Sequence, residues 1–221
     1  MAIKNNLERI IASLPANITL VAVSKTKPIA DLMEAYHSGQ RVFGENKIQE
    51  MTEKWETMPK DIEWHMIGHV QTNKVKFMAE YVSLIHGVDS FKLLQEINKQ
   101  ALKHQRIINC LLQIHIAEEE TKFGLDASEL NELLTSEAFK ELKNIRIIGL
   151  MGMATFTENE SQIKKEFLHL KAIFDNLKSQ PTTYNLQPST LSMGMSGDYQ
   201  LAIACGSTMV RIGSSIFGGR I

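Results

Sequence analysis

The chain alternates between short apolar runs and longer segments in which apolar residues recur every three or four positions. Residues 2–13 carry the first such spacing, at Ile3, Leu7 and Ile10, which is typical of an amphipathic helix. Strand-like apolar runs and helical segments then follow in turn. The predicted strands are 19–24, 41–44, 63–68, 81–87, 106–116, 145–153, 189–195 and 208–213. The predicted helices are 28–37, 45–57, 71–80, 90–103, 127–142, 159–178 and 197–204.

Short apolar strands that alternate with amphipathic helices indicate parallel βαβ units. Eight such strands in 221 residues favour an α/β fold, a closed TIM-type (β/α)8 barrel with an N-terminal helix. A doubly wound open sheet is the alternative. Only about eight residues follow the last predicted strand. The N-terminal helix is therefore expected to lie across the first and last strands, where an eighth outer helix is missing.

The length and composition narrow the class of protein. A chain of 221 residues fits one barrel domain, spanning 1–221. The net charge of −1 gives no global field for nucleic acid or an anionic membrane. Neither of the two cysteines, Cys110 and Cys205, has metal-ligand spacing, and both are expected to be buried. No signal peptide or membrane-spanning run is evident, so we expect a cytoplasmic protein, and the lack of a dimerisation module favours a monomer.

The carboxyl ends of barrel strands are where such folds place their chemistry. Lys25 ends the apolar run LVAVS, so packing would hold its stem while its amine faces the barrel mouth. Apolar walls favour the neutral amine that Schiff-base formation needs. Lys27, two residues further on, is expected to be solvated. Both could equally be ordinary loop lysines.

Two glycine-hydroxyl segments are candidates for binding an anion. Gly206, Ser207 and Thr208 offer close backbone approach, hydroxyls and N–H donors. Ser196 lies in SMGMSGD (192–198), at the expected start of a helix, where unpaired N–H groups favour phosphate. Turn chemistry and helix capping would explain both segments equally well.

Three further polar residues stand at or inside apolar strands. Arg211 lies within TMVRIG, and a charge there is costly unless it forms a salt bridge or faces a ligand. Asn46 ends the FGEN segment and could meet a cofactor oxygen. His65 could contact a ligand nearby or be a buried histidine satisfied by the backbone.

Taken together, these motifs resemble the YggS/PROSC family of pyridoxal 5′-phosphate (PLP)-binding homeostasis proteins, which have an alanine racemase N-terminal domain-like barrel. The resemblance runs from about residue 20 to residue 219, with the motifs in the expected order. His69 and Val70 depart from it, because the family commonly has an apolar residue or proline and then leucine there. The motifs are AVSKTKP, FGEN, WHMIGHVQTNK, TKFG, GLMGM, LSMGMSGD and GSTMVRIGSSIFG.

The resemblance implies a fold-type III PLP barrel without the second domain of alanine racemase. It implies a Schiff base between PLP and Lys25, and Arg211 facing the pyridine nitrogen. Phosphate contacts are implied for Ser196, Ser207 and Thr208, beside Gly206, with Asn46 near the ring. It further implies a role in PLP homeostasis without catalytic turnover, with PLP-dependent apoenzymes as possible recipients.

A PLP-dependent amino-acid racemase is the competing function. Racemization by two bases needs an acid or base on each face of the substrate Cα, and Lys25 could serve one face. In the racemases the opposite base is a tyrosine from a second domain. None of the four tyrosines, Tyr36, Tyr81, Tyr184 and Tyr199, is expected at the carboxyl end of a strand.

Overall fold

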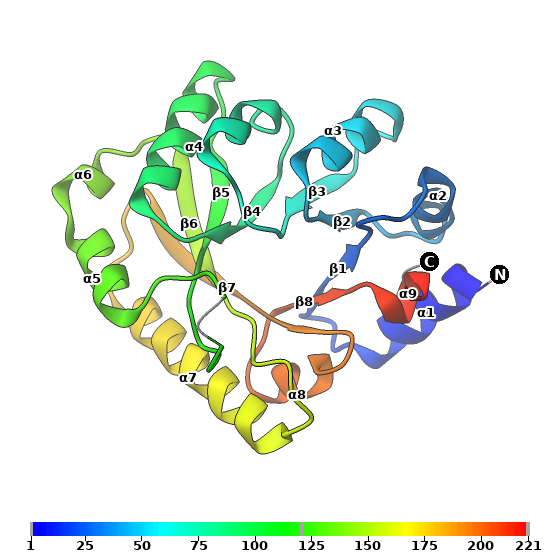
Figure 1. Ribbon diagram of the computed structural model, residues 1–221. Helices are drawn as coiled ribbons and strands as arrows, with labels where there is room; N and C mark the ends of the chain where they lie inside the picture. The colour runs from blue at the N-terminus through cyan, green and yellow to red at the C-terminus, as the bar shows by residue number, and fades with distance from the viewer. Residues whose placement is uncertain (1, 120–121, 220–221) are drawn as a thin grey trace.

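Eight parallel strands close into a barrel in the computed structural model, which describes residues 2–119 and 122–219 (Figure 1). Each strand pairs with the next along the chain, and the last pairs with the first. The closed order confirms the predicted TIM-type barrel and excludes the open sheet. The strands are β1 (Thr19–Val23), β2 (Val42–Glu45), β3 (Glu63–Met66), β4 (Leu84–Val88), β5 (Ile108–Gln113), β6 (Ile145–Met151), β7 (Leu186–Met195) and β8 (Met209–Ile212).

An outer ring of helices covers the strands, as Figure 1 shows. Their apolar stripes pack on the outward faces of the barrel strands, which is why the helical periodicity in the sequence located most of them. The helices are α1 (Ala2–Ser13), α2 (Ile29–His37), α3 (Ile48–Thr57), α4 (Phe91–Lys103), α5 (Ala127–Thr135), α6 (Glu137–Lys140), α7 (Glu160–Ser179), α8 (Tyr199–Ala204) and α9 (Ser214–Phe217), with a 3-10 helix η1 (Thr72–Phe77).

Two predicted helices differ from the structure. The helix predicted over 71–80 is the 3-10 helix η1, in which only Val75 is buried, too little apolar surface for two α-helical turns. The helix predicted over 127–142 is broken into α5 and α6 at Ser136. The Ser136 backbone is extended, and the Ser136 hydroxyl accepts a hydrogen bond from the Phe139 N–H, so a second helix begins there.

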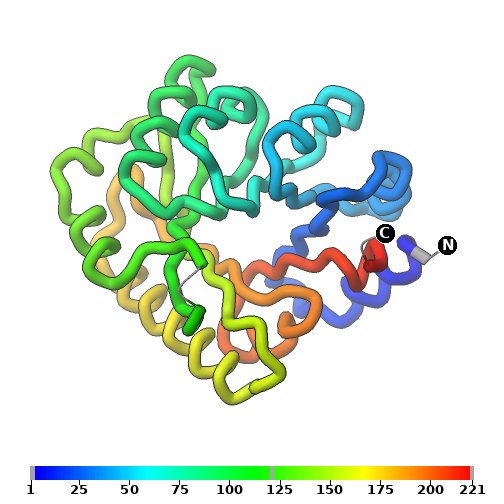
Figure 2. The backbone as a smooth tube through the Cα atoms, viewed as in Figure 1, coloured from blue at the N-terminus to red at the C-terminus, as the bar shows by residue number. Residues whose placement is uncertain are grey.

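The N-terminal helix occupies the gap beside the last strand. The single-turn helix α9 follows β8, and α1 packs against both α9 and α2 (Figures 1 and 2). The Asn6 side chain donates to the Ile216 carbonyl over 3.1 Å, and Leu7 of α1 is fully buried. The prediction that α1 fills this position is thus correct in place, but its main partners are the helices α9 and α2 and not the first and last strands.

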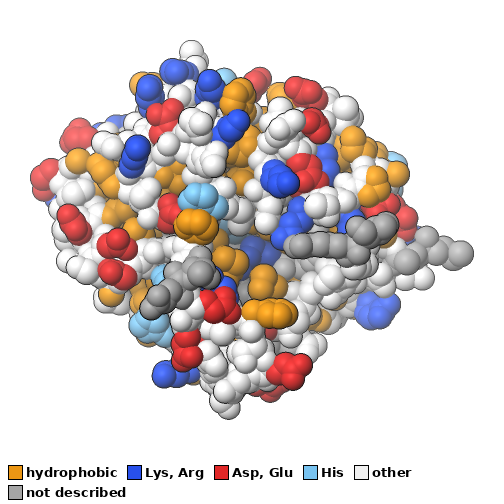
Figure 3. Space-filling view, in the orientation of Figure 1, with side chains coloured by type: hydrophobic (Ala, Val, Ile, Leu, Met, Phe, Trp, Pro, Cys, Tyr) orange, Lys and Arg blue, Asp and Glu red, His pale blue; other side chains and the backbone are white. Residues whose placement is uncertain are grey.

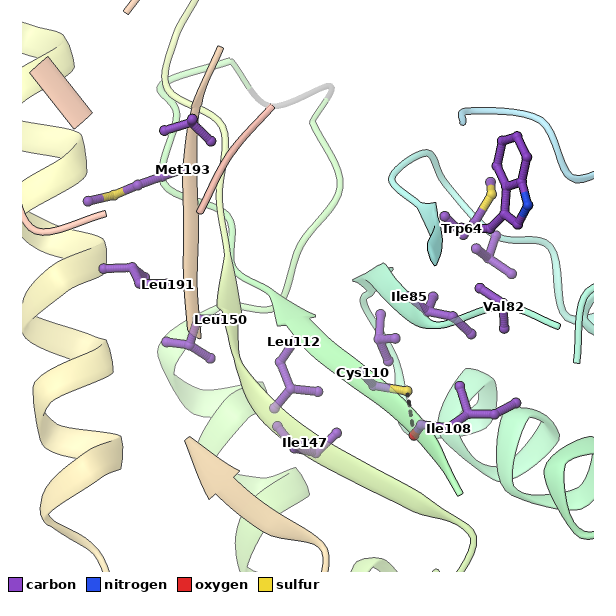
Figure 4. Packing of buried hydrophobic residues seen from close by; sticks show 14 of the residues in the cluster. Trp64, Val82, Ile85, Ile108, Cys110, Leu112, Ile147, Leu150, Leu191 and Met193 are labelled. Atoms are coloured by element: carbon purple, nitrogen blue, oxygen red, sulfur yellow. Dashed lines mark hydrogen bonds between the residues drawn. The ribbon is translucent and has the colours of Figure 1, made fainter. Parts of the chain in front are cut away.

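Two apolar clusters form the core. The larger lies between the strands and the helices and includes Trp64, Leu112 and Leu150 (Figure 4). The smaller lies inside the barrel and consists of Val21, Leu84, Leu111, Met151 and Met209. Full burial of one such side chain contributes ~1.5–3 kcal/mol. The interior cluster supports the carboxyl ends of the strands from below and thereby holds the residues at the mouth in place.

Both cysteines are buried and free, as predicted. Burial raises the pKa of the Cys110 thiol, which keeps it protonated and unreactive at neutral pH. Among the described residues, no cluster of histidine, cysteine and carboxylate side chains could hold a metal ion. No helix in that part of the chain is both long and apolar enough to span a bilayer.

Candidate functional site

A cavity of about 670 Å³ lies at the carboxyl ends of the strands. Four of the seven predicted site residues line it: Lys25 after β1, Asn46 after β2, Ser196 after β7 and Arg211 within β8. Figure 3 shows hydrophobic and basic side chains around a hollow near the centre of this face. Residues far apart in the sequence therefore meet at one place because the strands are parallel and close on themselves.

The turn that carries Lys25 is held in a strained conformation. Thr26 has a φ of 63°, a left-handed value that side chains rarely adopt, and its N–H donates to Glu50 Oε1 over 2.6 Å. The Lys27 N–H donates to the Ser24 carbonyl, and its Nζ to the Gly219 carbonyl, over 3.1 and 2.7 Å. Lys25 itself is half-buried and lines the cavity. These contacts fix the direction in which Lys25 leaves β1.

A buried charged cluster lies behind this turn. Lys54 Nζ lies 2.7 Å from both Glu45 Oε1 and Glu50 Oε1, and it donates to the Ser24 carbonyl over 2.8 Å. The Ser24 hydroxyl donates to Glu45 Oε1 over 2.6 Å. Burial raises the pKa of Glu45, and the adjacent Lys54 cation opposes that rise. The cluster joins α3, β2 and the Lys25 turn into one unit.

Arg211 projects into the barrel and is almost fully buried. Its Nη1 donates to the Ser192 hydroxyl over 2.6 Å and its Nη2 to the Gly152 carbonyl over 3.1 Å. Burial lowers its pKa to about 10, so the guanidinium stays charged at neutral pH. The partners of Arg211 are therefore a hydroxyl and a main-chain carbonyl, and not the carboxylate that a structural salt bridge would require. Part of its donor capacity remains for the cavity.

Ser196 lies beside main-chain groups that can bind an anion. Its hydroxyl accepts a hydrogen bond from the Gly213 N–H over 3.2 Å, and Gly197, Gly213 and Ser214 line the same part of the cavity. A Cβ on Gly213 would lie 3.0 Å from the Val23 carbonyl oxygen, so glycine lets β8 leave the barrel close to β1. Hydroxyl and amide donors around an open wall form a cradle for a phosphate-sized anion.

Gly206, Ser207 and Thr208 do not line the cavity, contrary to prediction. They precede β8, and the Thr208 carbonyl accepts from the N–H of Thr19, the first residue of β1. They therefore lie at the amino ends of the strands, the opposite end of the barrel from Lys25. The Ser207 hydroxyl is buried against the carbonyls of Leu191, Met193 and Met209, which is a structural role.

The histidines are divided between the rim and the interior. His69, which departs from the family pattern, stacks on Phe123 at 4.0 Å between ring centroids, and its Nδ1 lies 3.2 Å from Asp89 Oδ2. The neighbouring Val70 is buried in the core. His65 is buried beneath the cavity and contacts His86, another interior histidine. Thr121 of the TKFG motif lies outside the described residues.

Two features of the site were missed from the sequence. The Lys54 cluster gave no signal, because a lysine within a helix normally faces solvent. His86 and Ser192 lie inside the barrel against His65 and Arg211. Polar residues in apolar strands could have indicated an interior polar layer, as Arg211 did.

Comparisons with known proteins identify the class of barrel. The family model described as the N-terminal domain of alanine racemase matches residues 1–221. The fold is also that of the Clostridium difficile 630 alanine racemase, at a TM-score of 0.77 and 14% identity, although this chain covers only 56% of that one. The chain is thus a barrel of the alanine racemase N-terminal domain class.

More similar proteins define the family. The pyridoxal phosphate homeostasis protein of Aquifex aeolicus (strain VF5) is 40% identical over 202 residues, 91% of this chain and 86% of that protein. The structures of PipY from Synechococcus elongatus PCC7942 are 33% identical and cover 98% of this chain and 100% of PipY. Their TM-scores are 0.91 without PLP and 0.88 with PLP bound. The chain belongs to the family of pyridoxal phosphate homeostasis proteins, which confirms the resemblance.

Proposed function

We propose that the chain binds PLP as a Schiff base on Lys25 and serves PLP homeostasis. The observation that carries this proposal is the meeting of Lys25, Arg211 and Ser196 at one cavity. Bound PLP supplies an aldehyde for a lysine amine, a pyridine nitrogen and a phosphate, and the cavity offers a partner to each. PipY, at 33% identity, has been solved with PLP bound, which supports the same cofactor here.

The phosphate belongs beside Ser196. The Ser196 hydroxyl and the main-chain N–H groups of Gly197 and Ser214 would be the donors to it at that wall of the cavity, while the Gly213 N–H holds the Ser196 oxygen. Arg211 enters the cavity from β8 and would meet the pyridine nitrogen as a hydrogen-bond donor, which keeps that nitrogen unprotonated and weakens the ring as an electron sink. Asn46, which follows β2 and also lines the cavity, would meet the substituents of the ring.

The phosphate assignment predicts that Ser196→Ala weakens PLP binding at least about tenfold. The reason is that a hydrogen bond to a charged acceptor is worth ~1.5–3 kcal/mol. Fluorescence titration of the unloaded protein measures the change. Ser207→Ala is the matched control: it removes a buried serine hydroxyl at the other end of the barrel, so PLP affinity should be unchanged while stability falls by ~1 kcal/mol. An equal loss of affinity in both variants would contradict the assignment.

We propose further that the protein does not turn over a substrate. Two-base racemization needs a second base opposite Lys25. All four tyrosines lie in the described residues, and none lines the cavity. Tyr36 is bonded to Asp61, Tyr81 stacks on Trp55 at 4.4 Å and Tyr199 lies 3.3 Å from the Ser13 hydroxyl. The fourth, Tyr184, lies just before β7.

The absence of turnover predicts no exchange at the substrate Cα. PLP-loaded protein incubated with L-alanine in D₂O should yield neither deuterated alanine nor the D-isomer, as measured by NMR and chiral chromatography. Exchange on the order of 1–1000 per second, the range of ordinary enzymes, would establish a racemase instead. His69, which lines the cavity, would then be the first candidate for the second base.

The remaining expectations complete the proposal. PLP-dependent apoenzymes are the recipients we infer, because a Schiff base at an open barrel mouth can be passed to another amine. We further propose a single-domain, monomeric, cytoplasmic protein that binds no nucleic acid.

A further inference from the structure

The interior of the barrel contains an uninterrupted row of polar side chains. Arg211 Nη1 lies 2.6 Å from Ser192 Oγ, Ser192 Oγ lies 3.2 Å from His86 Nδ1, and His86 Nε2 lies 3.1 Å from His65 Nδ1. The row comes from β8, β7, β4 and β3 and crosses the barrel. All four side chains are at least nine-tenths buried. Barrel interiors are normally filled by branched apolar residues, so the row needs an explanation.

Hydrogen-bond counting fixes the direction of the row. Arginine can only donate, so Ser192 Oγ accepts from Arg211. The single hydroxyl hydrogen of Ser192 then has His86 Nδ1 as its acceptor. His86 must carry its proton on Nε2, where it donates to His65 Nδ1, and His65 carries its proton on Nε2 as well. In the reverse direction both histidines would carry their protons on Nδ1. His86 would then donate to Ser192 as Arg211 does, and the Ser192 hydroxyl hydrogen would have no acceptor in the row.

Burial supports neutral rings in this row. Burial lowers the pKa of His65 to about 3, and burial together with the nearby His65 and Arg211 lowers that of His86 well below the usual value. Neither ring takes a proton at neutral pH, so Arg211 is the sole cation in the row. A protonated His86 would donate from Nδ1 and compete with Arg211 for the Ser192 oxygen.

We propose that His86 and His65 are positioning residues for Arg211: through Ser192 they hold one edge of its guanidinium, so that its remaining N–H groups stay directed at the cavity. The Gly152 carbonyl holds Nη2, and the two anchors together fix the plane of the group. This inference rests on the proposed function in one respect only, that the group which Arg211 meets in the cavity is the pyridine ring of PLP. The direction and the anchoring are properties of the protein without cofactor.

The first test uses the unloaded protein. Long-range ¹H–¹⁵N NMR of the imidazoles should show His65 and His86 in the Nε2–H form, without titration between pH 6 and 9. Protons on both Nδ1 atoms, or a titration in that range, would overturn the inference. These results do not depend on whether the protein binds PLP, so they separate this inference from the proposed function.

The second test follows the Arg211 guanidinium by ¹⁵N NMR. Ser192→Ala and His86→Phe should each speed rotation of the guanidinium at least about tenfold, whereas Ser192→Thr, which keeps a hydroxyl, should restore slow rotation. Thr190→Ala, on the same strand, is the matched control and should have no effect. If Ser192→Ala speeds the rotation and a folded His86→Phe does not, the histidines do not position Arg211 and the inference is wrong.

The third test uses PLP-loaded protein. Ser192→Ala and His86→Phe should shift the midpoint of the pH titration of the cofactor absorbance in the same direction, and the double variant should shift it no further than the larger single effect. Additive shifts, or a shift in Ser192→Ala alone, would contradict the proposal that His86 acts on Arg211 through Ser192. A failure of PLP binding in the unmodified protein would instead refute the proposed function and leave the first two tests valid.

Discussion

The Lys54→Met variant is expected to lose about 3–5 kcal/mol of unfolding free energy at neutral pH, the cost of removing one partner from a buried ion pair. Lys54 and Glu45 are both buried, with 2.7 Å between Nζ and Oε1. Methionine fills similar space but leaves the Glu45 carboxylate without a counter-charge. Because Lys54 also holds Glu50 and the Ser24 carbonyl, the Lys25 turn should loosen as well. Urea unfolding followed by circular dichroism measures the loss.

The loss should depend on pH in a defined direction. The pKa of Glu45 is already raised by burial, and removal of the Lys54 cation raises it further. A carboxyl whose folded pKa exceeds its unfolded pKa stabilises the fold at low pH, and that stability is lost as pH rises through the folded pKa. The deficit of Lys54→Met should therefore shrink toward acid pH, where Glu45 is protonated.

Two controls make this prediction specific. Lys143→Met, at an exposed lysine whose ammonium group donates a hydrogen bond to the Lys140 carbonyl, should change stability by less than about 0.5 kcal/mol. Adding Glu45→Gln to Lys54→Met removes the unpaired charge and should recover part of the loss. A deficit that is the same at pH 5 and pH 8, or no deficit at all, would show that the pair does not stabilise the fold.

Most of the fold was predictable because the two hydrophobic periods are distinct. A strand such as β5 is an apolar run, and a helix such as α7 repeats every three or four residues, so their order alone indicates a barrel. The exceptions have local causes. η1 has a helical composition but little apolar surface, and Ser136 caps a new helix inside what reads as a single segment.

The site was predictable where strand order decides position. Lys25, Asn46 and Ser196 follow strands, and the carboxyl ends of parallel strands share one face, so their meeting could be inferred. Ser207 and Thr208 precede a strand, and the same rule places them at the other end. The row of side chains that ends at Arg211 was not predictable. Its members come from β8, β7, β4 and β3, and their contacts across the interior depend on side-chain geometry that no spacing in the sequence expresses.

The Lys25→Met variant is expected to abolish the absorbance of the PLP–lysine Schiff base and to weaken PLP binding more than about a hundredfold, or ~2.7 kcal/mol. Methionine keeps the apolar stem but has no amine, so only the phosphate and ring contacts would remain. Absorbance titration with PLP measures both effects. Lys27→Met is the matched control: Lys27 lines the same cavity, but its Nζ contacts the Gly219 carbonyl, so the absorbance band should persist.

Borohydride reduction of the PLP-loaded protein, followed by mass mapping of its peptides, tests the central claim most directly. Reduction converts the Schiff base into a stable secondary amine, so the label stays on the lysine that formed it. The cavity at the mouth of the barrel predicts a single phosphopyridoxyl group on Lys25. A label on Lys27 or on any other lysine, or no label at all, would contradict the assignment of Lys25 as the PLP-binding residue.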